Sequence, residues 1–467
     1  MSVIPSHFFV KCSLGSIVAL AILVLSGCAT LPSNPVYGTL DVEVPSSWTA
    51  VPPSSVSHGS TSDAWWQDFN DPVLDTLVTT AFDANRDLRI AAARLAQSRA
   101  LLSGFKAERL PRVDTRASVD YGRDSAEDPR TERADIGLRA AWEIDLFGKG
   151  ALAVRAARAE SDSMYRALEA ARIALAADVS SVYFELRTIE KRLSLKREAI
   201  ELAQRQEDVS QRKFEAGQVT VLDIERWQAR LAQERVALAD LEAAHRLRLQ
   251  QLALLLGSTQ VPDLGEHSML YTPPKSPASL LPAEILERRP DVRQPALSLD
   301  AALARAGVAR KEVYPSLQIT WSGTQENLAV QGSPNASRLL IAYGVSLSLP
   351  VFDSGRIHAH IKLQDARVQE ALAVYEKAML TALVDVESSF SKWADAGASF
   401  KEWQQAETIS NKTAHNAARL YDAGLCDLSA VLDARNSHLQ TRDALALAMG
   451  ARWEAAVGLR RAFAGRI

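Results

Sequence analysis

The longest regular pattern in the chain is helical. Residues 151–216 contain no glycine or proline, which is enough for about 99 Å of α-helix at ~1.5 Å per residue. Apolar residues here recur in alternating steps of four and three, and the same phase continues after a turn. They are Leu175, Val179, Val182, Leu186, Ile189 and Leu193, then Ile224, Trp227, Leu231, Leu238 and Leu241. This heptad spacing predicts a long coiled-coil hairpin.

A second pattern has a period of two. Apolar and polar residues alternate over about 112–122, 134–147, 315–325 and 338–351. Each run has one apolar and one polar face, as in strands of membrane barrels. A half-buried soluble sheet would show the same alternation, and the helices alone would also fit a freestanding coiled-coil rod.

The two patterns occur twice in the chain. Pro111 precedes one pair of strands and Pro315 the other; Phe147 and Phe352 precede the long helical stretches; Gly217 and Gly424 interrupt them. The separations are 204, 205 and 207 residues, which indicates duplication. We therefore divide the chain into repeats at 63–257 and 283–467, joined by a proline-rich linker at 258–282.

Four strands per chain cannot close a barrel, and an open sheet edge cannot face lipid without unsatisfied backbone groups. Other copies of the chain must complete the barrel. Two copies give about eight strands and a nearly filled interior, whereas three give about twelve and room for an aqueous lumen. The expected fold is mainly α, with a long helical barrel and a twelve-stranded membrane β-barrel in a homotrimer.

The N-terminal residues predict export and lipidation. A short polar start is followed by an apolar run over 14–25 and the sequence Leu25-Ser26-Gly27-Cys28. The run is too short to span a bilayer, so 1–27 is predicted to be a lipoprotein signal peptide. Cys28 would be acylated, and 28–62, rich in proline and serine, would form a tether. An ordinary cleaved signal is the alternative.

Composition narrows the function. The chain has 467 residues and a net charge of −3, with no basic patch that would suggest nucleic acid. Only Cys426 remains after Cys12 and Cys28, so no intrachain disulfide is expected. His358 and His360 lie two apart on a predicted helix and are badly spaced to share a metal. No hydrolase motif such as HExxH or GxSxG is present, so we expect no enzyme, metal or cofactor.

These segments together resemble the TolC-like outer-membrane efflux proteins, in particular the NodT-type lipoprotein branch that serves resistance–nodulation–division pumps. The resemblance covers essentially the whole mature chain. It is carried by Trp65-Trp66 with Phe69-Asn70-Asp71-Pro72, Ala92-Ala93-Arg94-Leu95, Trp142 to Lys149, Glu287 to Arg293, Tyr314 to Leu317, Pro350 to Arg356, and Tyr421 to Gly424 with Leu432 to Arg435.

The resemblance implies a homotrimeric exit duct for drugs or other small molecules, closed at rest by inward coiling of its inner helices. The expected partners are a periplasmic adaptor, an inner-membrane transporter and outer-membrane lipid. The adaptor itself is the alternative function, although it should have one hairpin and compact β domains. A lipid-anchored hydrolase is a third reading, without residues to support it.

Three groups of residues are candidate sites. The second turn would line the aperture, with an acidic ring that selects cations; Asp427 could instead be a simple helix cap. The first turn would contact the adaptor, or be only a hairpin turn. On the strands, acids outnumber Arg116 and Arg139, so the lumen is expected to be acidic. The candidates are Tyr421, Asp422, Gly424 and Asp427 for the aperture; Phe214, Glu215 and Gly217 for the partner contact; and Asp114, Asp120, Asp135, Glu143 and Asp145 for the lumen.

Overall fold

The computed structural model describes residues 41–49, 64–123, 125, 129–265 and 281–463. Its helices and strands all belong to one unit, Val42–Ile467; of the other unit, Met1–Asp41, only Asp41 is described. The expected signal peptide, Cys28 and most of the tether lie outside the described residues. The elements are η1 (Trp65–Phe69), α2 (Pro72–Ala84), α3 (Arg86–Ala107), β1 (Arg112–Gly122), β2 (Thr131–Ile144), α4 (Lys149–Glu215), α5 (Val221–Leu255), α6 (Pro282–Arg288), α7 (Pro290–Lys311), β3 (Ser316–Val330), β4 (Ala336–Ser348), α8 (Arg356–Asp422) and α9 (Leu428–Ala462).

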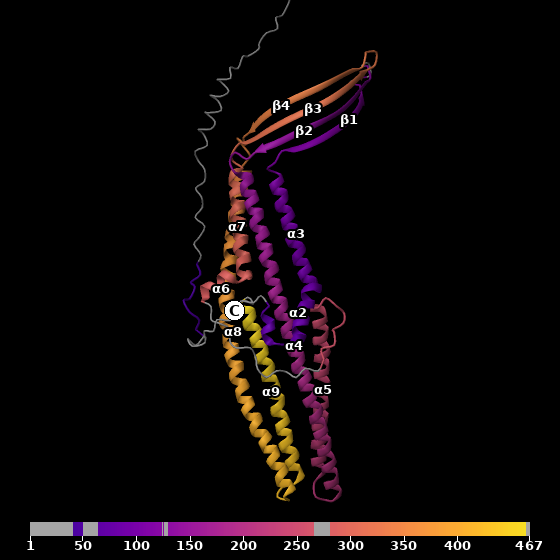
Figure 1. Cartoon of the computed structure of the whole chain (residues 1–467), viewed down its shortest axis with the longest axis vertical. Coiled ribbons are helices and arrows are strands. Elements are labelled where there is room, and N and C mark those ends of the chain that lie inside the picture. Colours follow the sequence, from indigo (N-terminus) through magenta and orange to yellow (C-terminus); the bar gives the residue numbers. More distant parts are fainter. Residues whose placement is uncertain (1–40, 50–63, 124, 126–128, 266–280, 464–467) are drawn as a thin grey trace, which may run out of the picture. The chain divides into compact units, whose positions relative to one another are not determined.

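The same succession of elements occurs twice (Figure 1). Helices α3 and α7 have 22 residues each, α4 and α8 have 67, and α5 and α9 have 35. α7 begins 204 residues after α3, whereas α8 and α9 begin 207 residues after α4 and α5. Each half of the unit therefore builds one pair of strands and one long helical hairpin. Figure 1 shows the sheet at one end of the unit and both hairpin turns at the other.

The strands form one antiparallel sheet in the order β1-β2-β3-β4. Val113, Ala140, Trp321 and Tyr343 stand opposite one another in a row across all four strands. This row lies on an apolar face that the single chain leaves uncovered, with Tyr343 81% exposed. The mainly helical fold with four amphipathic strands is confirmed. Several strand ends differ from the expectation. β2 begins at Thr131 and stops at Ile144, three residues early at each end, β3 continues to Val330, and β4 stops at Ser348, three residues before the expected end.

The heptad pattern marks the packed face of the first hairpin. Its α4 residues, from Leu175 to Leu193, are all buried. Ile189 and Leu193 pack against Leu241 of α5, with Leu238 at the edge of the same cluster. Near the turn the predicted seam is therefore the contact between α4 and α5, as in a coiled coil. Its earlier residues, Leu175 to Leu186, belong instead to a larger cluster with η1, α2 and α9.

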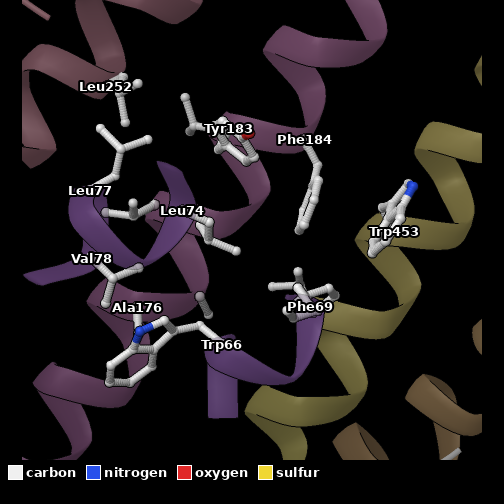
Figure 2. Packing of buried hydrophobic residues seen from close by; sticks show 14 of the residues in the cluster. Trp66, Phe69, Leu74, Leu77, Val78, Ala176, Tyr183, Phe184, Leu252 and Trp453 are labelled. Carbon is white, nitrogen blue, oxygen red and sulfur yellow. The ribbon is translucent and has the colours of Figure 1, made fainter. Parts of the chain in front are cut away.

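The largest apolar cluster joins both hairpins near mid-length. Figure 2 shows Trp66, Phe69 and Leu74 of η1 and α2 packed against α4 and α9. Phe184 of α4 stacks on Trp453 of α9, with ring centroids 4.7 Å apart. Burial of such side chains contributes roughly 1.5–3 kcal/mol each. The cluster fixes the two hairpins to each other well away from their turns.

A polar contact at equivalent places in the two repeats ties helix ends together. The buried Asn85 caps α3 and donates from Nδ2 to the carbonyl of Leu255, the last residue of α5, at 2.9 Å. The buried Arg289 precedes α7 and donates to the carbonyl of Ala462, the last residue of α9, at 3.0 Å. These donors satisfy carbonyls that a helix end leaves without an internal partner.

Candidate pore and hairpin tips

The polar face of the sheet carries most of the predicted lumen residues. Asp114 stands opposite Arg139, and Asp120 opposite Arg133. Asp135 and Glu143 lie on the same face of β2, on alternate residues with Arg139. If this face lines water, all four carboxylates reach the lumen.

Asp145 lies elsewhere. It follows the last residue of β2, and its carboxylate accepts hydrogen bonds from the backbone N–H of Gly150 at 3.0 Å and Ala151 at 2.7 Å. It also lies 3.9 Å from Nε of Arg109. The structure therefore places Asp145 as an acceptor at the N-terminus of α4, where a carboxylate is favoured. The strand predicted from the alternating pattern was three residues too long, and Asp145 is the first residue beyond the observed strand.

The expectation of an acidic lumen face does not agree with the register. The expectation counted neither Glu326 and Arg338, which lie on β3 and β4, nor Arg112 and Arg133, which lie near the starts of β1 and β2. Across the four described strands the polar face has five carboxylates and five guanidinium groups: Asp114, Asp120, Asp135, Glu143 and Glu326 with Arg112, Arg116, Arg133, Arg139 and Arg338. The face is balanced in formal charge.

Glu326 is the centre of an ion cluster that joins three strands. Its carboxylate lies 2.7 Å from Arg133 of β2 and is also bonded to Arg338 of β4. The Glu326 side chain is 4% exposed, whereas both arginines are about half exposed. Asp135 stands opposite Glu326 and Asp120 opposite Arg133, so the positive charge of the two arginines is compensated on this part of the polar face.

The two hairpin turns have the same backbone geometry. Gly217 and Gly424 both have φ of +70°, a left-handed conformation that favours glycine. Each follows its long helix and donates its N–H to a carbonyl three residues earlier, on Phe214 at 2.8 Å and on Tyr421 at 2.9 Å. Either glycine replaced by another residue would strain this helix end. Phe214 and Tyr421 are both partly exposed beside the turns.

The turns are joined by a contact between repeats. Lys213 of α4 donates to Asp427 at 2.9 Å and to Ser429 at 3.1 Å. Asp427 also caps α9 by accepting from the N–H of Ala430 at 3.0 Å. The hydrogen bond from Lys213, helped by that of Ala430, holds the pKa of Asp427 below its usual value. Asp427 is therefore both a helix cap and one side of a bridge between the hairpins.

Asp433 is an acidic residue near the second turn that the site candidates omitted. Burial, with the neighbouring charge of Asp427, raises its pKa above the usual value. It lies in α9 in the segment Leu432 to Arg435, which the resemblance already included, but helical phase alone did not separate it from other polar positions. Asp422, at the end of α8, is exposed.

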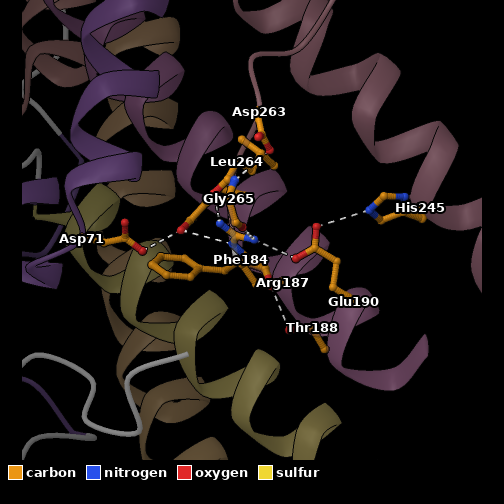
Figure 3. Close-up of polar contacts among 10 residues, drawn as sticks. Asp71, Phe184, Arg187, Thr188, Glu190, His245, Asp263, Leu264 and Gly265 are labelled. Atoms are coloured by element: carbon orange, nitrogen blue, oxygen red, sulfur yellow. Dashed lines mark hydrogen bonds and ion pairs between the residues drawn. The ribbon is translucent and has the colours of Figure 1, made fainter. Parts of the chain in front are cut away.

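A buried polar network fixes the chain that follows the first hairpin (Figure 3). The Arg187 side chain, 6% exposed, donates to the carbonyls of Leu264 and Gly265 and pairs with Glu190 at 2.9 Å. It also approaches Tyr183, whose hydroxyl donates to Asp71 at 2.6 Å. Burial, followed by the bond to Asp71, raises the pKa of Tyr183, so its hydroxyl stays protonated. The heptad pattern gave no sign of this network.

Two further properties concern the described part of the chain as a whole. Its helices include none that is long and apolar enough to cross a membrane. Among the same residues, no three His, Cys, Asp or Glu side chains are grouped so as to hold a metal ion. His360 is instead bonded to Glu312 at 3.2 Å and to Gln364 at 3.1 Å.

An open amphipathic sheet attached to two tip-joined helical hairpins defines the subunit of a membrane channel. A family model described as outer membrane efflux protein matches residues 77–258 and 281–465. These segments fall on the two repeats and cover most of the chain, so the chain belongs to this family. It is an outer-membrane efflux channel protein, and the adaptor alternative receives no support.

Individual relatives agree with the family assignment. The solvent efflux pump outer membrane protein SrpC of Pseudomonas putida is 29% identical over 452 residues, covering 91% of this chain and 92% of that protein. The probable outer membrane lipoprotein SilC of Salmonella typhimurium is 26% identical over 431 residues, with 91% and 92% covered. The solved outer-membrane channel OprN has a TM-score of 0.80 at 29% identity and covers 92% of this chain and 98% of its own.

Proposed function

We propose that three copies of this chain form a passive exit duct for small molecules, fed from the periplasm by an inner-membrane transporter and its adaptor. The observation that carries the proposal is the open four-stranded sheet, with two unpaired outer strands and an uncovered apolar face. A lipid-facing sheet must be closed to satisfy its backbone. Three copies give about twelve strands and a lumen wide enough for water.

The internal repeat predicts how neighbouring copies pair. Within the chain, Leu138 of β2 stands opposite Gly323 of β3. Suppose that β4 pairs with β1 of the next copy in the same register as β2 pairs with β3. A residue of β2 then corresponds to the residue of β4 that is 207 positions later, and a residue of β3 corresponds to the residue of β1 that is 204 positions earlier. The same two shifts relate the helices of the two repeats. Applied to the paired residues of β1 and β2, they give the paired residues of β3 and β4. Val345 should then stand opposite Val119 of the neighbouring copy, on the apolar face of both strands.

Disulfide trapping tests both the trimer and the register. With Cys426 replaced by serine, Val345→Cys is combined in turn with Thr115→Cys, Ala117→Cys, Val119→Cys or Tyr121→Cys. The Val119 pair should crosslink best into covalent trimers, because opposed side chains lie within about 5.5 Å. Thr115 is the matched control, roughly 13 Å away along the strand. A best partner other than Val119 would correct the register, whereas no crosslink and a monomeric mass in detergent would refute the shared barrel.

The lipid anchor is proposed from the N-terminal pattern and from relatives. Cys28 follows a lipobox-like sequence, and SilC is described as a probable outer membrane lipoprotein. Acyl chains on Cys28 would hold the N-terminus at the inner leaflet, while the barrel itself spans the membrane. Mass spectrometry of the mature N-terminal peptide tests this: a diacylated or triacylated cysteine supports it, and a free thiol refutes it.

The exported compound is a small molecule whose chemistry the transporter selects. SrpC is named for solvents, and OpmQ of Pseudomonas aeruginosa, 28% identical over 461 residues with 95% of each chain covered, is named for pyoverdine export. A balanced lumen face favours a duct that discriminates weakly among such molecules. Deletion of the gene should lower tolerance or secretion for one compound class, and restoration should need the intact barrel.

A further inference from the structure

A cavity of about 350 Å³ separates the two hairpins above their turns. Leu202 of α4 lines it on one side and Leu439 of α9 on the other. His438 lies in its wall, ten residues into α9 and therefore about 15 Å from the turn. Opening of the tip by movement of the second hairpin would have to change this packing. The cavity is thus placed where a small change in charge can act on the tip.

His438 is held between α8 and α9 and is only 17% exposed. Its Nδ1 lies 3.1 Å from Oγ of Ser410, and its Nε2 lies 3.8 Å from the carboxylate of Glu407. One turn further along α9, Arg442 bonds Glu198 of α4 at 2.7 Å. The imidazole is therefore one turn from an ion pair that joins the two hairpins.

The charges around the imidazole are mixed. Those in contact with it or lining the same cavity are Glu407 and His415 of α8, Arg435 and Arg442 of α9, and Glu198, Glu201 and Arg205 of α4. Burial is the main cause that lowers the pKa of His438; Glu407 and Glu198 oppose this, while Arg442 and His415 add to it. The packed arrangement therefore favours the neutral ring.

The lowered pKa of His438 determines how the packing of the hairpins should depend on pH. A histidine that is harder to protonate in the packed state has no effect on that state well above its unperturbed pKa of about 6.5, and destabilises it relative to an exposed ring as the pH falls below that value. As the pH falls below this value, protons bind preferentially to any arrangement that exposes the ring to water. Acid should therefore shift the equilibrium toward hairpins that have moved apart.

We propose that the contact of His438 with Ser410 and Glu407 of α8, in the wall of the cavity between the hairpins, is sensitive to acid, and that protonation of the ring favours separation of the hairpins and opening of the tip. The proposal rests on the channel function above and adds a regulator to it. The contact differs from the pair Lys213–Asp427 at the turn, because that pair involves no group with an ordinary pKa near neutrality. Acidification of the periplasm would then ease passage through the closed end.

Planar-bilayer recording of the purified channel tests the proposal. Lowering the pH on the hairpin side from about 7.5 to about 5.5 crosses the ordinary imidazole pKa. Open probability of the wild-type channel should rise, because each protonated copy can change the ratio of open to closed channels by at most about tenfold for each pKa unit that separates the two states. His438→Gln can still bond Ser410 but cannot become charged, so its open probability should not change. His358→Gln is the matched control, because that exposed histidine lies in the first turn of α8, at the end remote from the cavity, and it should behave as wild type.

A second readout is independent of conductance. Leu202→Cys and Leu439→Cys place thiols on opposite walls of the cavity, in a Cys426→Ser background. The yield of a short bifunctional crosslink should fall in acid for this variant, and not when His438→Gln is added. A crosslink yield or open probability that responds equally with and without His438 overturns the proposal. A protein that never conducts, yet shows the His438-dependent change in yield, would count against the channel function and in favour of the contact.

Discussion

At the scale of residues, a contact between the two turns should determine how firmly the hairpins are held together near their tips. Lys213 and Asp427 form the described contact between them, and the bond from Lys213 lowers the pKa of Asp427. A carboxyl with a lowered pKa contributes stability above its unfolded value, near 3.9, and loses it only as the pH falls through the lower folded value. Above about pH 5 the pair should therefore stay intact, and His438 should dominate any response to mild acid.

Asp427→Asn separates the two roles of this residue. Asparagine caps a helix about as well as aspartate, so α9 should keep its stability while the charge partner of Lys213 is lost. We expect a higher open probability in bilayers at neutral pH. Asp422→Asn is the control, because Asp422 ends α8 and is exposed. Equal effects of the two substitutions would mean that the total acidic charge around the axis of the trimer, and not the ion pair with Lys213, holds the tip closed.

Asn85 and Arg289 should differ in their effect on stability. Asn85→Ala removes a cap and one bond to Leu255, a loss of about 1–2 kcal/mol. Arg289→Met removes a buried guanidinium that donates to the carbonyl of Ala462 and pairs with Asp291 and Asp385. We expect it to lower the stability more, by about 3–5 kcal/mol. Thermal dissociation of the trimer, followed by gel electrophoresis, should show both effects. The ranking would be wrong if Asn85→Ala lowered the midpoint more.

For the helices and strands, the sequence pattern predicted the type and approximate length of each element. It did not predict the residue at which an element ends or the element that packs against it. The heptads between Leu175 and Leu193 identify the packed seam because burial recurs every three or four residues in a helix. Asp145 was assigned to a strand because polar and apolar residues continue to alternate beyond Ile144, the last residue of β2. Glu326 and Lys213 escaped notice for another reason. Their partners lie on other strands or on the other hairpin, so their roles depend on register and packing that no local pattern specifies.

The charge balance of the sheet predicts weak ion selectivity, and Glu326 is the residue that should shift it. Glu326→Gln leaves Arg133 and Arg338 without their carboxylate, so the reversal potential in a salt gradient should move toward anions. Asp145→Asn removes the same formal charge from outside the strand face and should leave the potential nearly unchanged. A clear cation preference in the wild-type channel, lost with Asp145→Asn, would restore the acidic-lumen interpretation.

In the whole molecule, the two hairpins have equal lengths, and we propose different roles for their turns. Both long helices have 67 residues, so their turns arrive at the same level, where Lys213 can reach Asp427. Both turns expose apolar side chains, Phe214, Val221 and Leu222 on the first and Tyr421 and Leu425 on the second, while the second hairpin also carries Asp422, Asp427 and Asp433 near its turn. Exposed apolar side chains in a group mark interaction sites, and we propose the first turn for the adaptor contact and the second, with its three acids, for the aperture. This difference makes the two roles separable by experiment.

A pair of matched substitutions tests this division. Phe214→Asp should abolish capture of the adaptor and export in cells, because it places a charge in the proposed contact, while trimer mass and bilayer conductance stay as in the wild type. Tyr421→Asp makes the same change at the other turn, on a residue 43% exposed. It should alter conductance and spare adaptor capture. Affinity pull-down of the adaptor and single-channel recording measure the two properties independently. If Phe214→Asp changed conductance and Tyr421→Asp changed capture, the assignment of the turns would have to be exchanged.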